Sequence, residues 1–103
     1  MSNFIVVLCT VPVGGSDNIA KALVEERLAA CVNVVLVRSH YVWEGRLCVD
    51  PEELMIIKTE QRMVEALKER ILDLHSYQVP EIIVIPIKEG HEPYLNWIDQ
   101  SVG

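Results

Sequence analysis

The 103-residue sequence has few cysteines, few basic residues and no long apolar run. Its three cysteines, Cys9, Cys31 and Cys48, are an odd number at wide spacings with no Cys-x-x-Cys pair. This pattern argues against a disulfide framework or a preformed structural zinc site and favours free thiols in a reducing compartment. No apolar run approaches the roughly 18 residues that a membrane helix needs, so we expect a protein that does not span a membrane.

Basic residues are also scarce, with nine Lys and Arg against fifteen Asp and Glu and a formal net charge of −6. The nine are scattered along the chain, so binding to nucleic-acid phosphates lacks its electrostatic basis. The apolar segment at residues 1–13 has no cation before it, unlike a secretory signal. We therefore interpret it as a core strand and expect a cytoplasmic protein.

Apolar residues make up half of the chain, which predicts one folded domain over residues 1–103. Continuous runs rich in β-branched residues predict strands buried on both faces at 4–11 and 81–87. Helical spacing of apolar residues predicts amphipathic helices at 17–29, capped by Ser16 or Asp17, and at 61–74. Between them, residues 31–59 have β character with a turn at Glu44-Gly45, and Glu92-Pro93 begins a short terminal helix.

The order βαββαβ with a helical tail predicts a ferredoxin-like α+β sandwich, in which the first and fourth strands are antiparallel neighbours. Hairpin arms of roughly 13 residues extend roughly 43 Å, beyond the roughly 35 Å diameter of a compact domain of this length. The hairpin should therefore overhang the domain and expose Tyr41, Val42 and Trp43, which predicts oligomerisation. The alternative is a hairpin bent at Pro51 or at a bulge and folded onto its own sheet.

Five segments, in order, carry a family resemblance: VVLCT (6–10), EERLAACVN (25–33), YVWEG (41–45), ELMIIKT (53–59) and HSYQVPEI (75–82). Over nearly the whole chain the sequence resembles the CutA divalent-cation-tolerance proteins. The resemblance implies a trimer in which long hairpins extend the sheets of neighbours, and a role in tolerance of copper and other divalent metals. It also implies copper binding, with ligands that correspond to Cys9 and His75. Leu74 stands where some members carry a second histidine.

The predicted topology supports that ligand pair, because it brings the end of the first strand, with Cys9, beside the start of the fourth, near His75. A thiolate and an imidazole suit copper(I) or zinc, although zinc usually takes four ligands. Each residue also has a structural explanation. Cys9 lies in an apolar run and can be a packed core residue, and His75 can pair with carbonyls at a helix end.

A second group of residues, Trp43, Lys58, Tyr77 and Glu81, can line a pocket between subunits if the hairpin reaches a neighbour. The alternatives are a surface ion pair between Lys58 and Glu81, and an interface role for Trp43. No hydrolase, phosphate-binding or dinucleotide motif is present, so we expect a protein that is not an enzyme. A copper-binding tolerance trimer leads, followed by a trimeric PII-like small-ligand sensor and, distantly, a cysteine enzyme.

Overall fold

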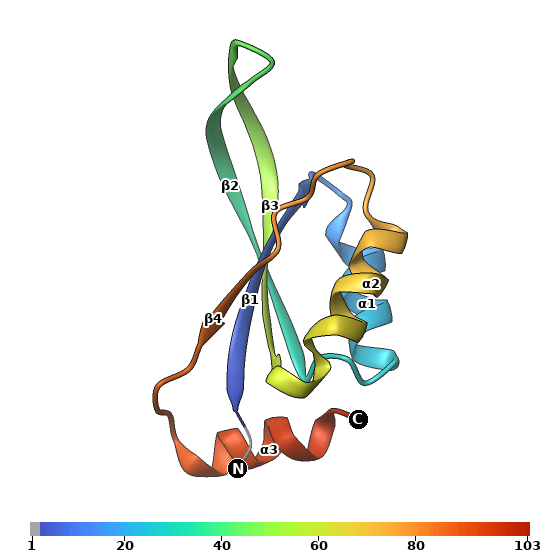
Figure 1. Cartoon of the computed structure of the whole chain (residues 1–103), viewed down its shortest axis with the longest axis vertical. Coiled ribbons are helices and arrows are strands. Elements are labelled where there is room, and N and C mark those ends of the chain that lie inside the picture. The colour runs from blue at the N-terminus through green and yellow to red at the C-terminus, as the bar shows by residue number, and fades with distance from the viewer. Residues whose placement is uncertain (1–2) are drawn as a thin grey trace.

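The computed structural model describes residues 3–103, and its element order confirms the predicted βαββαβ pattern with a terminal helix. The elements are β1 (Phe4–Pro12), α1 (Ser16–Glu25), β2 (Cys31–Trp43), β3 (Arg46–Glu60), a 3-10 turn (Gln61–Met63), α2 (Val64–Leu74), β4 (Ile83–Pro86) and α3 (Glu92–Ser101). All strand pairs are antiparallel, in the order β2-β3-β1-β4. This is the ferredoxin-like fold, with α1 and α2 on one side of the sheet (Figure 1).

The core lies between the sheet and these two helices. Alternate residues of β1 face the helices, and β3 adds Met55 and Ile57 directly opposite Cys9 and Val7. The buried core residues of these elements are Ile5, Val7, Cys9, Val11, Met55 and Ile57 from the strands, Ile19 and Leu23 from α1, and Val64, Leu67 and Ile71 from α2. The alternate residues of the strands and the apolar stripes of the two helices therefore pack together in one core layer.

The other face of the sheet, away from α1 and α2, is also apolar, and α3 packs against it at the end that carries Phe4 (Figure 1). We call it the open sheet face and define it by Val6, Leu8, Val35, Leu54, Ile56, Ile83 and Ile85, which the strand register places on one side. Ile83 is 49% exposed and Ile85 42% exposed. The prediction that strands 4–11 and 81–87 are buried on both faces is therefore wrong for the single chain, because β1 is buried on one face only and β4 is mostly exposed.

The hairpin of β2 and β3 is regular along its whole length. Pairing runs without interruption from Cys31, which lies opposite Lys58, to Trp43, which lies opposite Arg46. Pro51 lies opposite Arg38 without a bulge. Because β1 ends at its pairing with Glu52, the rest of the hairpin has no third strand, and it projects beyond the body of the molecule (Figure 1). The chain is accordingly elongated, at 44 × 25 × 21 Å, which confirms the predicted overhang and excludes the bent alternative.

The turn at the hairpin tip is also as predicted. Glu44 and Gly45 both have positive φ, at 50° and 76°, the backbone that suits a two-residue turn between right-twisted strands.

Helix α1 differs from its prediction at both ends. It ends at Glu25 rather than at residue 29, because Arg27 adopts a left-handed φ of 61° and the N–H groups of Leu28 and Ala29 both donate to the carbonyl of Leu23. At its start, Ser16 does not cap the helix with its own oxygen. Its hydroxyl and backbone N–H instead donate to Glu53 Oε1 of β3, at 2.6 and 3.1 Å.

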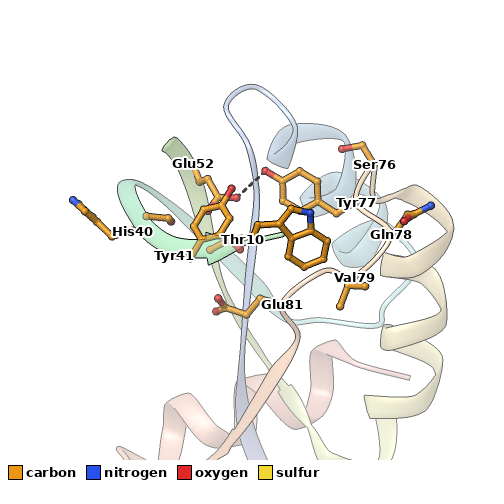
Figure 2. Close-up of a pocket in the computed structure, with 11 residues that line it drawn as sticks. Thr10, His40, Tyr41, Glu52, Ser76, Tyr77, Gln78, Val79 and Glu81 are labelled. Atoms are coloured by element: carbon orange, nitrogen blue, oxygen red, sulfur yellow. Dashed lines mark hydrogen bonds between the residues drawn. The ribbon is translucent and has the colours of Figure 1, made fainter. Parts of the chain in front are cut away.

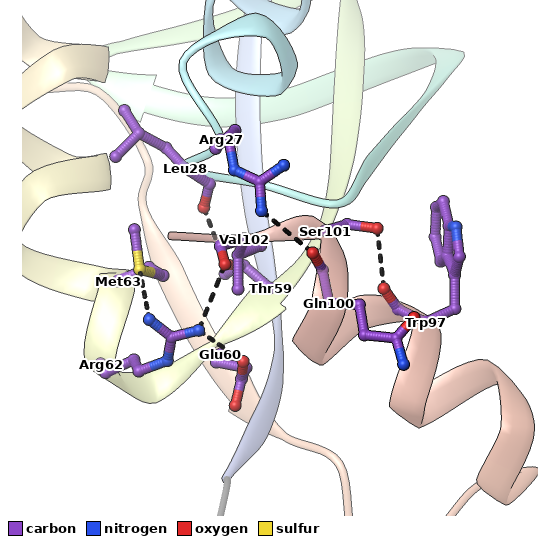
Figure 3. Close-up of polar contacts among 10 residues, drawn as sticks. All are labelled: Arg27, Leu28, Thr59, Glu60, Arg62, Met63, Trp97, Gln100, Ser101 and Val102. Atoms are coloured by element: carbon purple, nitrogen blue, oxygen red, sulfur yellow. Dashed lines mark hydrogen bonds and ion pairs between the residues drawn. The ribbon is translucent and has the colours of Figure 1, made fainter.

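The C-terminal segment lies at the end of the molecule away from the hairpin tip (Figure 1) and is fastened there by polar contacts (Figure 3). Arg27 donates to the carbonyl of Gln100 at 3.0 Å, and Arg62 donates to the carbonyl of Val102 at 3.3 Å. Ile98 and Val102 are buried in a second small cluster. Helix α3 therefore stabilises one end of the sheet and leaves the other end free for the site described next. None of the helices within residues 3–103 has the length and apolar character to cross a membrane.

Candidate functional site

A pocket of about 650 Å³ lies where the hairpin leaves the body of the molecule, beside the connection between α2 and β4 (Figure 2). We call it the hairpin pocket. It is lined by Thr10 of β1, Ser39, His40, Tyr41 and Trp43 of β2, Glu52 of β3, and Ser76, Tyr77, Gln78, Val79 and Glu81 of the connection. Its volume falls in the range of roughly 300–1,000 Å³ that is typical of small-molecule sites.

The hairpin pocket continues the open sheet face. Thr10 lies two residues beyond Leu8 along β1, and Glu52 lies two residues before Leu54 along β3. Because side chains in a strand alternate between faces, both point to the side opposite α1 and α2. The apolar face and the polar, aromatic pocket thus form one surface on the same side of the sheet.

The lining combines aromatic rings with acidic groups. Tyr41, Trp43 and Tyr77 supply rings, Glu52 and Glu81 supply carboxylates, and the lining includes neither lysine nor arginine. Glu52 is only 5% exposed. A carboxylate removed from water needs donors or a cation nearby, so this end of the pocket has a defined polarity.

Tyr77 supplies the donor that Glu52 needs, with its hydroxyl 2.8 Å from Glu52 Oε2 (Figure 2). Burial, and then the hydrogen bond to Glu52, raise the pKa of Tyr77 to about 12, so the phenol is protonated and donates at neutral pH. On the hairpin, the hydroxyl of Tyr41 donates to Asp50 at 2.7 Å, and this bond raises the pKa of Tyr41. Both phenols therefore donate their protons to carboxylates of the protein.

Three of the four residues predicted to share a pocket between subunits, Trp43, Tyr77 and Glu81, line this pocket within a single chain, and the pocket between subunits stays a prediction. Lys58 lies elsewhere, further along β3, where its ammonium donates to Asn33 Oδ1. No ion pair joins it to Glu81 within the described part of the chain. Glu52 was not among the residues predicted from the sequence. Pairing of the first and third strands could have located it, because it lies opposite Pro12 at the end of β1.

Cys9, the first predicted metal ligand, faces the core. It is fully buried between β1 and the helices, and its Sγ lies 3.8 Å from the carbonyl oxygen of Thr10. Burial is the largest cause that raises the pKa of the Cys9 thiol to about 12, and the nearby charges of Glu81 and Glu52 add to it. At neutral pH the sulfur is therefore a thiol rather than the thiolate that metals bind.

His75, the second predicted ligand, ends α2, as its helix-end explanation requires. Its ring does not bond to carbonyls of α2, however. Nδ1 accepts from the backbone N–H of Tyr77 at 3.0 Å, and Nε2 lies 2.8 Å from the carbonyl oxygen of Thr10. Since Nδ1 is an acceptor, the neutral ring carries its proton on Nε2 and donates it to Thr10. His75 thus ties the end of α2 to the end of β1.

Cys9 and His75 therefore meet at one carbonyl, that of Thr10, as the topology predicted. In this conformation a copper ion would have to displace the thiol proton and the hydrogen bonds of both ring nitrogens. Within residues 3–103, moreover, no three His, Cys, Asp or Glu side chains are grouped so that they can hold a metal ion. The assignment of these two residues as ligands stays a prediction.

Fold and site together define a small ferredoxin-like α+β protein with an overhanging hairpin and an acidic, aromatic pocket at its base. The family model described as "CutA1 divalent ion tolerance protein" matches residues 5–101. The chain therefore belongs to the CutA1 divalent-ion-tolerance family, and the predicted resemblance is confirmed.

Individual relatives agree with this assignment. The chain is 50% identical over 100 residues to the "Divalent-cation tolerance protein CutA" of Thermus thermophilus, which covers 95% of this chain and 97% of that protein. The crystal structure of CutA1 from Oryza sativa matches with a TM-score of 0.95 at 44% identity, covering 98% of this chain and 94% of that one. A structure titled "PII-like protein CutA from Nostoc sp. PCC 7120 in apo form" matches with a TM-score of 0.91 at 32% identity, covering 100% and 98%.

Proposed function

We propose that this family member serves divalent-cation tolerance as a homotrimeric ligand-binding protein, and that the hairpin pocket is its recognition site. The observation that carries the proposal is the contrast between its two candidate sites. The hairpin pocket is open and combines rings with carboxylates. The side chains of Cys9 and His75 are both engaged within the fold. A binding role in the manner of a small-ligand sensor follows, and the PII-like description of the Nostoc relative supports it.

Assembly into a homotrimer is supported by the open sheet face. Val35, Ile83 and Ile85 are between 42% and 49% exposed there. They adjoin the partly buried apolar residues of the same face on β1 and β3. A contiguous apolar surface of this kind on a soluble protein marks an interaction site. The edges formed by β2 and β4 also present unpaired backbone groups that strands of another copy can extend.

The same assembly would complete the hairpin pocket. Since Thr10 and Glu52 lie on the side of the open sheet face, a copy packed on that face covers the mouth of the pocket. A ligand held there would be enclosed by two chains. Sedimentation equilibrium at micromolar concentration tests the assembly, with the mass of three chains as the expected result and the mass of one chain as the result that refutes it.

Copper binding by Cys9 and His75 is the second candidate function, and zinc is its variant. The observation in its favour is their meeting at the Thr10 carbonyl. Such binding would have to remove a proton from a thiol whose pKa is about 12 and release His75 from Thr10. Both changes weaken affinity at neutral pH, because only the thiolate and the free imidazole nitrogen are ligands.

Two experiments separate these candidates. In the first, copper(I) is added under reducing conditions to the wild type, Cys9→Ala and His75→Gln, and we expect the same weak heat from all three. If the wild type binds copper(I) stoichiometrically with micromolar affinity and either variant abolishes that binding, Cys9 and His75 form a copper site. That result would refute the preference for the hairpin pocket over this site.

In the second experiment, fractions of a metabolite extract are added to the protein and its thermal unfolding is measured. A ligand that binds only the folded state raises Tm. We expect a stabilising fraction that loses its effect in Trp43→Leu and keeps it in Trp97→Leu, which changes the other tryptophan, one outside the pocket. Absence of any stabilising fraction, or equal loss in both variants, would refute the pocket as the recognition site.

A further inference from the structure

We propose that the ligand of the hairpin pocket is an alkylated organic ammonium ion, bound between the aromatic rings and the carboxylates of Glu52 and Glu81. This proposal rests on the proposed function of the pocket as a recognition site. The charges of the lining, the direction of the phenol hydrogen bonds and the aromatic rings all favour such a cation.

The charge of the lining favours a cation. Glu52 and Glu81 are its acidic groups, and His40 is its one basic side chain. An anionic ligand such as a nucleotide would meet the negative charge of these two carboxylates with no lysine or arginine in the lining to offset it.

Hydrogen-bond directions disfavour an anion on separate grounds. A phosphate or carboxylate ligand needs donors, and the phenols of Tyr41 and Tyr77 would be strong ones. Both are already donating, Tyr41 to Asp50 and Tyr77 to Glu52. What these residues leave to a ligand is the face of each ring and the remaining lone pairs of the carboxylates.

Aromatic faces distinguish an organic cation from a metal ion. A cation over the face of a Trp or Tyr ring is attracted by the ring's quadrupole, and alkyl groups on nitrogen add apolar contact that a hydrated metal ion cannot make. Trp43, Tyr41 and Tyr77 bring three rings to one pocket. Within residues 3–103 no three His, Cys, Asp or Glu side chains are grouped to hold a metal ion, so the acidic groups of the pocket are better matched to an ammonium head.

Choline and its neutral carbon isostere, 3,3-dimethylbutan-1-ol, test the proposal because they differ in charge and hardly in shape. The two indole N–H signals of the protein, from Trp43 and Trp97, report the binding by NMR in the full-length assembly. We expect choline to shift the Trp43 signal saturably and to leave Trp97 unmoved. The isostere should bind ~10-fold or more weakly, which is the discrimination that a desolvated cation–π contact supplies.

Matched variants locate the charge. Glu81→Gln should weaken choline binding ~10-fold at low salt. Glu89→Gln removes the same charge from an exposed residue outside the pocket and should leave the affinity within about twofold. Equal binding of choline and the isostere, or equal effects of the two variants, would overturn the proposal.

The same signals keep the two proposals distinguishable. If ATP shifts the Trp43 signal and choline does not, the pocket is a ligand site and the ammonium assignment is refuted. If a metabolite fraction stabilises the protein without shifting Trp43, the ligand binds elsewhere and both proposals fail.

Discussion

Tyr77→Phe is the substitution whose consequence follows most directly from the geometry. It removes one oxygen and keeps the ring, whose centroid lies 4.9 Å from that of His75. The loss falls on Glu52, which accepts the Tyr77 hydroxyl at 2.8 Å and is 5% exposed. A carboxylate so poorly exposed to water is then left without this donor.

The magnitude follows from the charge of the acceptor. Hydrogen bonds to charged groups contribute about 1.5–3 kcal/mol, and 1 kcal/mol per chain corresponds to about 5 °C in a domain of about 100 residues. Tyr77→Phe should therefore lower Tm by about 8–15 °C, measured by calorimetry at pH 7 and fixed protein concentration.

A double-mutant cycle with Glu52→Gln isolates the bond. In the Glu52→Gln background the acceptor is neutral, so the same Tyr77→Phe change should cost about 1 kcal/mol or less. A Tm change below about 2 °C for Tyr77→Phe would show that the carboxylate is adequately solvated. An equal cost in both backgrounds would show that the effect arises from packing. Either result would refute the stated role of Glu52.

Three further predictions concern the interface, the start of α1 and the core thiol. Ile85→Lys, on the open sheet face, should convert the sedimenting species to single chains, whereas Val24→Lys, an equally exposed site on α1, should not. Hydrogen bonds from Ser16 lower the pKa of Glu53 below 4.5, so the stability they supply is present above about pH 4.5 and lost as pH falls through the lower folded value. Ser16→Ala should flatten this acid dependence of Tm, and an unchanged slope would contradict the assignment. Iodoacetamide at pH 8 should spare Cys9, whose pKa is about 12, until the protein is unfolded, and rapid labelling of the native protein, seen by mass spectrometry, would contradict its burial.

Most of the fold could be predicted from the sequence because local and long-range signals agree. Apolar runs rich in valine and isoleucine predicted the strands, helical spacing predicted α1 and α2, and Glu44-Gly45 predicted the hairpin turn. The burial of β1 and β4 could not be predicted in the same way. An apolar residue has the same sequence signature whether it faces the core or a surface that a further chain can cover, so the exposure of Ile83 and Ile85 appears only in the structure.

The candidate site was predictable in part, for a different reason. Topology brought Cys9 toward His75, and the hairpin brought Trp43 to the same pocket as Tyr77 and Glu81. The bond from the His75 ring to Thr10 could not be predicted, since it depends on the path of the connection after α2. That path decides whether the imidazole is free for a metal or held by the backbone.

Growth in elevated copper tests the central claim most directly, using cells that lack their own family member and express this chain. Equal expression and unchanged assembly of each variant are verified first. We expect Cys9→Ala to support growth as the wild type does and Trp43→Leu to fail, as the proposed role of the hairpin pocket requires. Growth with Trp43→Leu and failure with Cys9→Ala would contradict the account and place the function at the core thiol.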